Sequence, residues 1–212
     1  MSEPPSLFPH QPVVRRLPWE IHPSLREERL KLCARMLADA RRDAVALRRA
    51  DLGDDGWSVG CRAYAFGRKR LRQAADEKRY SWLSIRDSSN RFIFRIGEVD
   101  VRFFRGSADE PTRRTLRRHG EEARQIALPL HADVTAGLVF RFALEADEAG
   151  DIERVVFLAL HGEDGHAECF WPIPLDAAPV RRAAAGRQLT LLGDEGLASD
   201  WYRLDPEAPP DT

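Results

Sequence analysis

The chain has 212 residues, 43% of them hydrophobic, which suits one domain with a normal core and terminal extensions. The net charge of −1 hides a strong asymmetry along the chain. Residues 1–59 contain 10 basic and 9 acidic residues, residues 60–124 contain 17 basic and 9 acidic residues, and residues 125–212 contain 6 basic and 16 acidic residues. This pattern indicates either that one surface attracts polyanions or that the basic and acidic segments pair with each other.

The composition also argues against membrane and secreted proteins. Cys33, Cys61 and Cys169 are far apart and form no CxxC pair, which is typical of buried thiols in a reducing compartment. No run of about 18 apolar residues could span a membrane, and the N-terminus has no basic flank leading into an apolar core. We therefore expect a cytoplasmic protein without a membrane partner.

In chain order, the proline-rich residues 1–23 predict an irregular, flexible arm. Residues 24–27 (Ser-Leu-Arg-Glu) match a capping box, and the apolar residues that follow at helical spacing predict a helix ending near the turn residues 51–56. A second helix is predicted over about residues 57–78. Its apolar side would be formed by Trp57, Cys61, Tyr64, Ala65, Leu71 and Ala75.

Residues 82–106 predict three antiparallel strands joined by two turns. Gly97 begins a two-residue loop in which a type II′ turn needs a positive φ angle, and residues 87–90 form the other turn. Because side chains alternate along a strand, this register puts eight apolar residues on one face and the charged residues on the other. The expected pairs are Ile96 with Val99, Phe94 with Val101, Phe92 with Phe103, Ile85 with Phe92, and Leu83 with Phe94.

A third, arginine-rich helix is expected over about residues 111–124. Three further strands are predicted at residues 138–146, 152–161 and 166–173. Together these elements predict an α+β fold, with a mostly antiparallel sheet of about six strands and the two N-terminal helices packed on one face. The domain would span residues 24–175, and the acidic residues 176–212 would form a flexible tail.

Basic residues gather in three places of this predicted fold. The second helix contributes Arg68, Lys69, Arg70 and Arg72. The outer sheet face contributes Arg86, Arg91, Arg95 and Arg102, and the third helix contributes Arg113, Arg114, Arg117 and Arg118. Arginine interleaved with aromatic side chains, here Trp82 and Phe104, is typical of nucleic-acid binders, which hold phosphates and stack bases.

Two other interpretations of these basic residues stay open. They could be ordinary solvated side chains, with Arg95 paired across the strands with Asp100, or be covered by another element. Alternatively, the protein could be an interaction module, such as an antitoxin or a regulatory protein, whose arginine-rich face meets an acidic protein surface.

A short motif lies in the predicted tail and consists of Gln188, Leu189, Thr190, Leu191 and Leu192. It resembles the peptide by which bacterial DNA replication and repair proteins dock onto the sliding clamp, which runs Gln, Leu, a small polar or acidic residue, Leu, then Phe or Leu. A flexible segment with one amide and closely spaced apolar side chains suits a preformed groove. The resemblance implies recruitment to a clamp. The alternative is an apolar patch that docks on the protein's own sheet or begins a short helix.

Signs of catalysis are sparse. Residues 161–166 (His-Gly-Glu-Asp-Gly-His) place two histidines and two carboxylates around one turn, but this context favours a plain hairpin loop over a metal site. Glu98 and Asp100 are similar to the strand carboxylates of metal-dependent nucleases, a remaining alternative, but the expected Lys does not follow them. Phosphate-loop and nucleophile motifs are absent from the sequence. The sequence favours a non-enzymatic protein without a cofactor.

Overall fold

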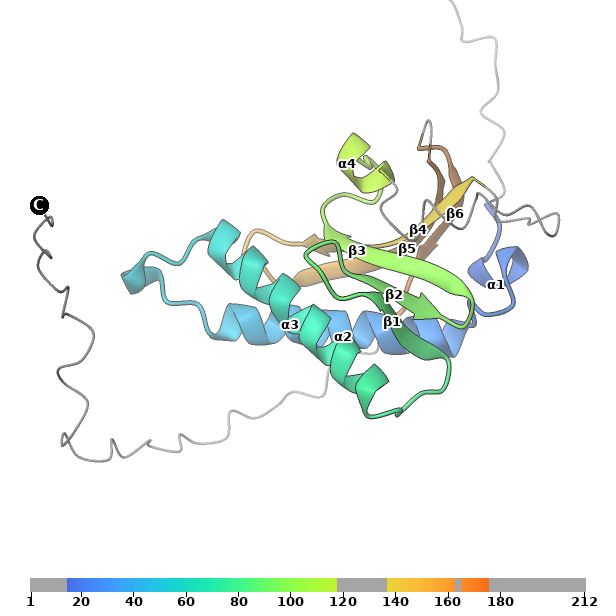
Figure 1. The fold of residues 1–212 in the computed structure, drawn as a ribbon. Helices are drawn as coiled ribbons and strands as arrows, with labels where there is room; N and C mark the ends of the chain where they lie inside the picture. The colour runs from blue at the N-terminus through green and yellow to red at the C-terminus, as the bar shows by residue number, and fades with distance from the viewer. Residues whose placement is uncertain (1–14, 118–136, 163–164, 176–212) are drawn as a thin grey trace, which may run out of the picture. The chain divides into compact units, whose positions relative to one another are not determined.

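The structure is a computed structural model that describes residues 15–117, 137–162 and 165–175 (Figure 1). Six strands form one sheet in the same order as in the chain. They are β1 (Leu83–Asp87), β2 (Ile93–Ile96), β3 (Val99–Arg105), β4 (Leu138–Ala146), β5 (Ile152–His161) and β6 (Ala167–Pro172). All neighbours are antiparallel except β3 and β4, which run parallel. The predicted α+β fold with a mostly antiparallel sheet is confirmed.

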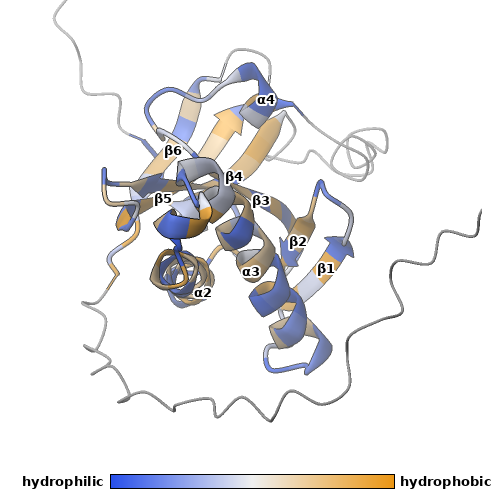
Figure 2. Ribbon diagram, turned by 90° about the vertical axis from the view of Figure 1, so that its left-hand side faces the viewer, coloured by the Kyte–Doolittle hydropathy of each residue, from blue (hydrophilic) through white to orange (hydrophobic). Residues whose placement is uncertain are grey.

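Two long helices, α2 (Glu27–Ala46) and α3 (Gly56–Asp76), pack against each other and cover one face of the sheet (Figure 2). The short helices are α1 (Pro18–Ile21), η1 (Ala50–Leu52) and α4 (Arg113–Leu116). Helix α1 lies in the segment expected to be irregular, and its Trp19 ring meets the Trp171 ring edge-on, with 5.3 Å between centroids. Within the described residues, every helix is too short or too polar to cross a bilayer.

The helix-side core fills the space between α2, α3 and the sheet. Leu37 and Leu71 from the helices are buried there. Phe94, Phe142 and Phe157 meet them from three different strands, with ring centroids 6.1 Å apart for the first pair and 5.2 Å for the second. Because side chains alternate between the two faces of a strand, this core takes in the apolar side chains of only one face of the sheet.

The α4-side core lies on the opposite face of β4 and β5. Val156 and Leu158 pack there with Ala108 and Leu116, which come from the connection between β3 and β4. Parallel strands need a crossover connection, and this crossover supplies the cover. Strand β5 is therefore buried on both faces, which explains why residues 155–160 form a continuous apolar run rather than an alternating pattern.

The predicted capping box at the start of α2 is wrong. The residue that precedes the helix is Arg26, and no side chain caps the helix there. Ser24 instead turns its Oγ toward the β2–β3 turn and accepts a hydrogen bond from the Glu98 backbone N at 3.4 Å. A Cβ added at Gly97, whose φ angle is +60°, would overlap Ser24, so this turn needs glycine both for its conformation and for the close approach.

The predicted apolar side of the second helix is partly wrong. Trp57 is 75% exposed and Cys61 is exposed, whereas Val59, Gly67 and Leu71 are buried. Gly67 faces the core because α3 passes so close to Phe103 that an added Cβ would lie 3.2 Å from its ring. The N-terminus of α3 is capped by Asp55, whose Oδ1 accepts from the backbone N of Trp57 and of Ser58.

The predicted strand register is confirmed for two of the three β2–β3 pairs, because Phe92 lies outside β2 and does not pair with Phe103. It is wrong between β1 and β2. Phe94 pairs with Val101 and Ile96 with Val99, as expected. Across the other turn, Ile85 pairs with Phe94 and Leu83 with Ile96, two residues from the predicted positions. The register also shifts between Ile85 and Asp87, and Phe92 takes a φ angle of 21° outside the strand. A shift of two residues leaves Leu83 and Ile85 on the predicted apolar face, where both pack against the helix-side core.

Two other predictions lie wholly or partly outside the described residues. The helix expected over residues 111–124 is shorter than predicted: α4 begins after its cap Thr112 and ends at Leu116, because the backbone of Arg117 is extended. Residues 118–124 lie outside the description. The predicted tail from residue 176 onward and residues 1–14 of the predicted arm also lie outside it.

Candidate nucleic-acid interface

Some of the predicted binding arginines are engaged in ion pairs within the protein. Arg95 Nε lies 2.6 Å from Asp100 Oδ1, and Arg86 Nε lies 3.9 Å from the same oxygen. Arg70 pairs with Asp43 and so connects α3 to α2. The Asp100 side chain is only 4% exposed, so Arg95 is the cross-strand partner of a buried carboxylate, as one interpretation of the sequence predicted.

Arg102 and a residue that the sequence analysis missed, Arg141, hold the α4 segment on the sheet. The two residues are neighbours in the parallel register of β3 and β4. Arg102 Nη1 and Arg141 Nη2 both donate to the carbonyl oxygen of Arg117, at 3.4 and 3.5 Å. Arg141, which is 1% exposed, also donates through Nε to the Thr115 carbonyl oxygen at 2.9 Å. A lone Arg in the apolar run of residues 138–144 was the signal that could have revealed this contact.

Arg68 anchors α3 to the β1–β2 turn. Its Nη2 donates to the Ser88 carbonyl oxygen at 2.6 Å. Its guanidinium group also lies over the rings of Tyr64 and Phe92, 5.7 and 5.5 Å from their centroids. The Tyr64 hydroxyl donates to the carbonyl oxygen of Asn90 in the same turn. The turn is therefore held from the helix side while Arg102 Nε reaches the Arg91 carbonyl oxygen from the sheet.

These contacts bring basic residues from four parts of the chain to one end of the strands, around the β1–β2 turn. Burial raises the pKa of the Tyr64 phenol, whereas the nearby charges of Arg68, Arg102 and Arg114 lower that pKa. Three guanidinium groups, from α3, β3 and α4, thus lie within electrostatic range of one hydroxyl. We call this end of the sheet the basic rim. It comprises Arg68, Arg91, Arg102, Arg114 and Arg117.

One carboxylate belongs to the rim. Hydrogen bonds from Ser89 lower the pKa of Asp87, and the charges of Arg91 and Arg102 lower it further. Asp87 Oδ1 accepts from the Ser89 backbone N at 2.7 Å and so shapes the turn. With the guanidinium groups of Arg68, Arg91, Arg102 and Arg114 against one carboxylate, the rim has a net positive charge and could hold phosphate groups through charge-assisted hydrogen bonds.

The remaining basic residues predicted to bind nucleic acid lie in separate places in the structure. Lys69 and Arg72 are exposed on α3, and Arg113 is exposed on α4, so the two helices present these charges on opposite sides of the sheet. Arg118 lies outside the described residues. The twelve basic residues therefore do not form one continuous face. The rim is the place where the described arginines from different elements converge.

The aromatic part of the prediction needs correction. Trp82 does not lie on the outer face; it packs at the border of the helix-side core, where its ring contacts Tyr80 and lies beneath Arg29. Phe104 packs, half-buried, on the α4-side core. The aromatic residue at the rim is Tyr64, which the sequence analysis assigned only to the apolar side of a helix.

The described residues also bear on metal-dependent chemistry. They contain no group of three or more His, Cys, Asp or Glu side chains that could hold a metal ion. The His161 and His166 rings stack with centroids 6.0 Å apart, but residues 163 and 164 between them lie outside the description. Asp100 is held by Arg95, whereas Glu98 is 86% exposed in a turn, so these two carboxylates do not form the convergent pair that a nuclease would use.

The clamp-like motif at residues 188–192 lies outside the described residues. Comparisons of the chain with protein-family models, with curated proteins and with solved structures find no match.

Proposed function

We propose that this is a non-enzymatic, cytoplasmic accessory protein that contacts nucleic acid through the basic rim. We further propose that it is recruited to the bacterial sliding clamp through residues 188–192. The observation that carries the first part is the convergence of arginines from α3, the β1–β2 turn, β3 and α4 at one end of the sheet. The second part depends on the resemblance of the tail motif.

The rim suits a phosphate backbone better than a base edge. Arg68 and Arg102 are fixed by protein carbonyl groups, so they form a preorganised positive floor. Arg91, Arg114 and Arg117 are exposed around them and can reach outward. Contacts of this kind position a nucleic acid without reading its sequence, and their strength falls with salt because bound counterions are released.

The first test is binding of the full chain to fluorescent single-stranded and double-stranded oligonucleotides over a range of salt concentrations. The variant Arg91→Ala/Arg114→Ala should bind all sequences more weakly. It should also reduce the slope of log K against log salt by up to about 2 on duplex DNA. The matched control is Arg26→Ala/Arg48→Ala, which removes the same charge from exposed positions outside the rim and should leave the slope unchanged. Equal slopes in both variants would exclude the rim as the contact surface.

The alternative of an acidic protein partner uses the same rim and has the same salt dependence. Competition separates the two: excess nonspecific DNA should displace a labelled oligonucleotide from the rim if nucleic acid is the ligand. A protein that binds no oligonucleotide but retains an acidic partner in the presence of excess DNA would favour the interaction module.

Recruitment to the clamp is tested separately with a fluorescent peptide spanning residues 181–196 and a purified bacterial sliding clamp. We expect micromolar binding that the double change Gln188→Ala/Leu191→Ala abolishes, because it removes the amide anchor and one apolar side chain. Absence of binding by the unchanged peptide would reject the clamp proposal and leave the rim proposal standing.

A further inference from the structure

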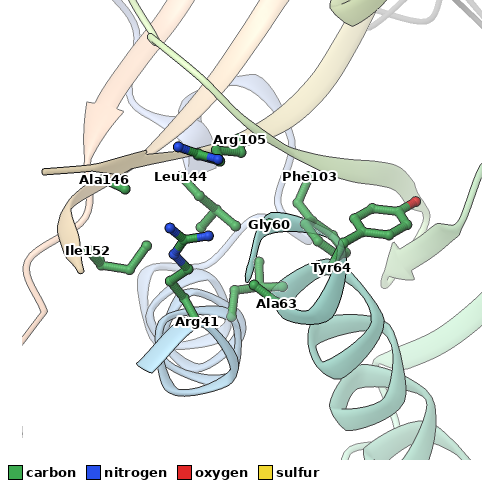
Figure 3. Close-up of a pocket in the computed structure, with 10 residues that line it drawn as sticks. Arg41, Gly60, Ala63, Tyr64, Phe103, Arg105, Leu144, Ala146 and Ile152 are labelled. Carbon is green, nitrogen blue, oxygen red and sulfur yellow. The ribbon is translucent and has the colours of Figure 1, made fainter. Parts of the chain in front are cut away.

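A cavity of about 40 Å³ lies between α2, α3 and the sheet, and Tyr64 of the basic rim forms part of its wall (Figure 3). Most of its wall is apolar and includes Leu37, Ala63, Leu144 and Ile152. Two guanidinium groups complete it: Arg41 rises from α2 on one side and Arg105 comes from β3 on the other, as Figure 3 shows. A largely apolar cavity with two positive groups is an unusual combination that calls for a chemical reason.

Arg41 is the more informative of the two. It is only 4% exposed, and its Nε donates to the Gly150 carbonyl oxygen at 2.6 Å. Its Nη1 is buried and has no hydrogen-bond partner among the described residues. A buried guanidinium donor without an acceptor is costly, so this position favours an acceptor that enters the cavity.

The surrounding charges favour an anion as that acceptor. Burial and the charge of Arg105 lower the pKa of Arg41, while Asp151 and Asp147 in the β4–β5 turn raise it. Asp147 Oδ1 already accepts hydrogen bonds from the backbone N of Gly150 and of Asp151, at 2.8 and 2.9 Å. The residues that line the cavity include no carboxylate, so no lining side chain offers Arg41 Nη1 a charged acceptor, and an anionic ligand could supply one.

We propose that this cavity binds a short-chain monocarboxylate such as acetate. A carboxylate oxygen accepts from Arg41 Nη1 and faces Arg105, because a guanidinium group matches the planar carboxylate geometry. The alkyl end lies against Leu144 and Ile152. One water needs roughly 10–15 Å³ of such space, so the cavity has room for a group of three or four heavy atoms. Phosphate needs more polar partners than these apolar walls offer.

The test uses the full chain with isotope-labelled methyl groups, whose signals from Leu144 and Ile152 report on the cavity in every variant. Sodium acetate is titrated against sodium chloride at constant ionic strength. We expect a saturable shift of these methyl signals with acetate at roughly millimolar concentrations, as suits a ligand of four heavy atoms, and no saturable shift with chloride.

Three variants decide the assignment. Arg41→Met removes the buried donor and should weaken acetate binding at least tenfold. Ala63→Leu retains both guanidinium groups but fills the cavity, and it should abolish binding even if Arg41→Met fails to fold. Arg42→Met changes the adjacent, exposed arginine and should bind like the unchanged protein. Lack of a saturable acetate response, or equal affinity in the unchanged protein and Ala63→Leu, would overturn the proposal.

Discussion

The two faces of the sheet are stabilised in different ways. On the helix side, α2 and α3 span 20 and 21 residues and bury wide apolar stripes against aromatic rings of the strands. On the other side, α4 has four residues, too few for an independently stable helix. Its backbone carbonyl groups are instead held by the buried guanidinium of Arg141 and by Arg102. Apolar area holds the long helices in place, whereas hydrogen-bond donors hold the short one.

The largest expected effect is on the apolar side. Phe94 is fully buried against Phe142, so Phe94→Ala should lower the free energy of unfolding by about 3–5 kcal/mol, because it leaves a cavity in the helix-side core. Urea denaturation measures this loss. The comparison variant is Phe104→Ala, which truncates a half-buried ring on the α4 side and should cost less than half as much. A loss below about 1 kcal/mol for Phe94→Ala would contradict the assigned core.

A smaller effect is expected on the polar side. Arg141→Met should lower the free energy of unfolding by about 1–3 kcal/mol, because the buried carbonyl group of Thr115 loses its donor and that of Arg117 keeps only Arg102. Hydrogen exchange at the Leu116 amide should accelerate more than exchange in α2. Arg113→Met, an exposed change on the same helix, should have neither effect. Unchanged exchange at Leu116 in Arg141→Met would show that the guanidinium group does not hold α4.

The smallest expected effect is on how the stability of the protein depends on pH. At the α2–α3 connection, hydrogen bonds from the Arg49 backbone N and from Arg62 lower the pKa of Asp54 from 3.8 to about 2. The unfolded chain therefore takes up this proton at a higher pH than the folded chain. The stabilisation is present above pH 3.8 and is lost as the pH falls toward about 2.

Asp54→Asn should therefore flatten the loss of stability between about pH 4 and pH 2, as measured by urea denaturation at several pH values. The Arg141 contacts to carbonyl groups contain no group that titrates in this range, so Arg141→Met should leave the pH profile parallel to that of the unchanged protein. An unaltered acid profile in Asp54→Asn would show that its hydrogen bonds do not contribute to stability.

Much of the fold follows from local patterns in the sequence. The bounds predicted for residues 138–146 and 152–161 are those of β4 and β5, because turn residues delimit both runs. The β2–β3 register followed from Gly97, where the two-residue turn permits one alignment. The β1–β2 register did not follow, because a shift of two residues leaves the apolar face unchanged and only the longer turn decides between the alternatives.

The candidate site was less accessible to sequence reasoning. Clusters of neighbouring arginines suggested one basic face. Acidic partners far along the chain decide, however, which of these arginines form ion pairs within the protein. Arg70 is paired with Asp43, and Arg95 with Asp100. Arg141 and Arg41 went unnoticed because their partners are backbone carbonyl groups, which every residue has. Tertiary contacts therefore set the role of each arginine more strongly than local charge density does.

The order of the strands has a consequence for how the protein folds. Because the sheet repeats the order of the chain, residues 83–105 and 138–172 each form a three-stranded meander from local contacts, which favours rapid folding. Only the parallel β3–β4 pairing must close a long connection. The entropic free-energy cost of that closure rises by only about 0.6 kcal/mol when the connection doubles in length. Lengthening this connection after residue 117 should therefore slow the docking of two preformed halves while leaving the folding of each half unchanged.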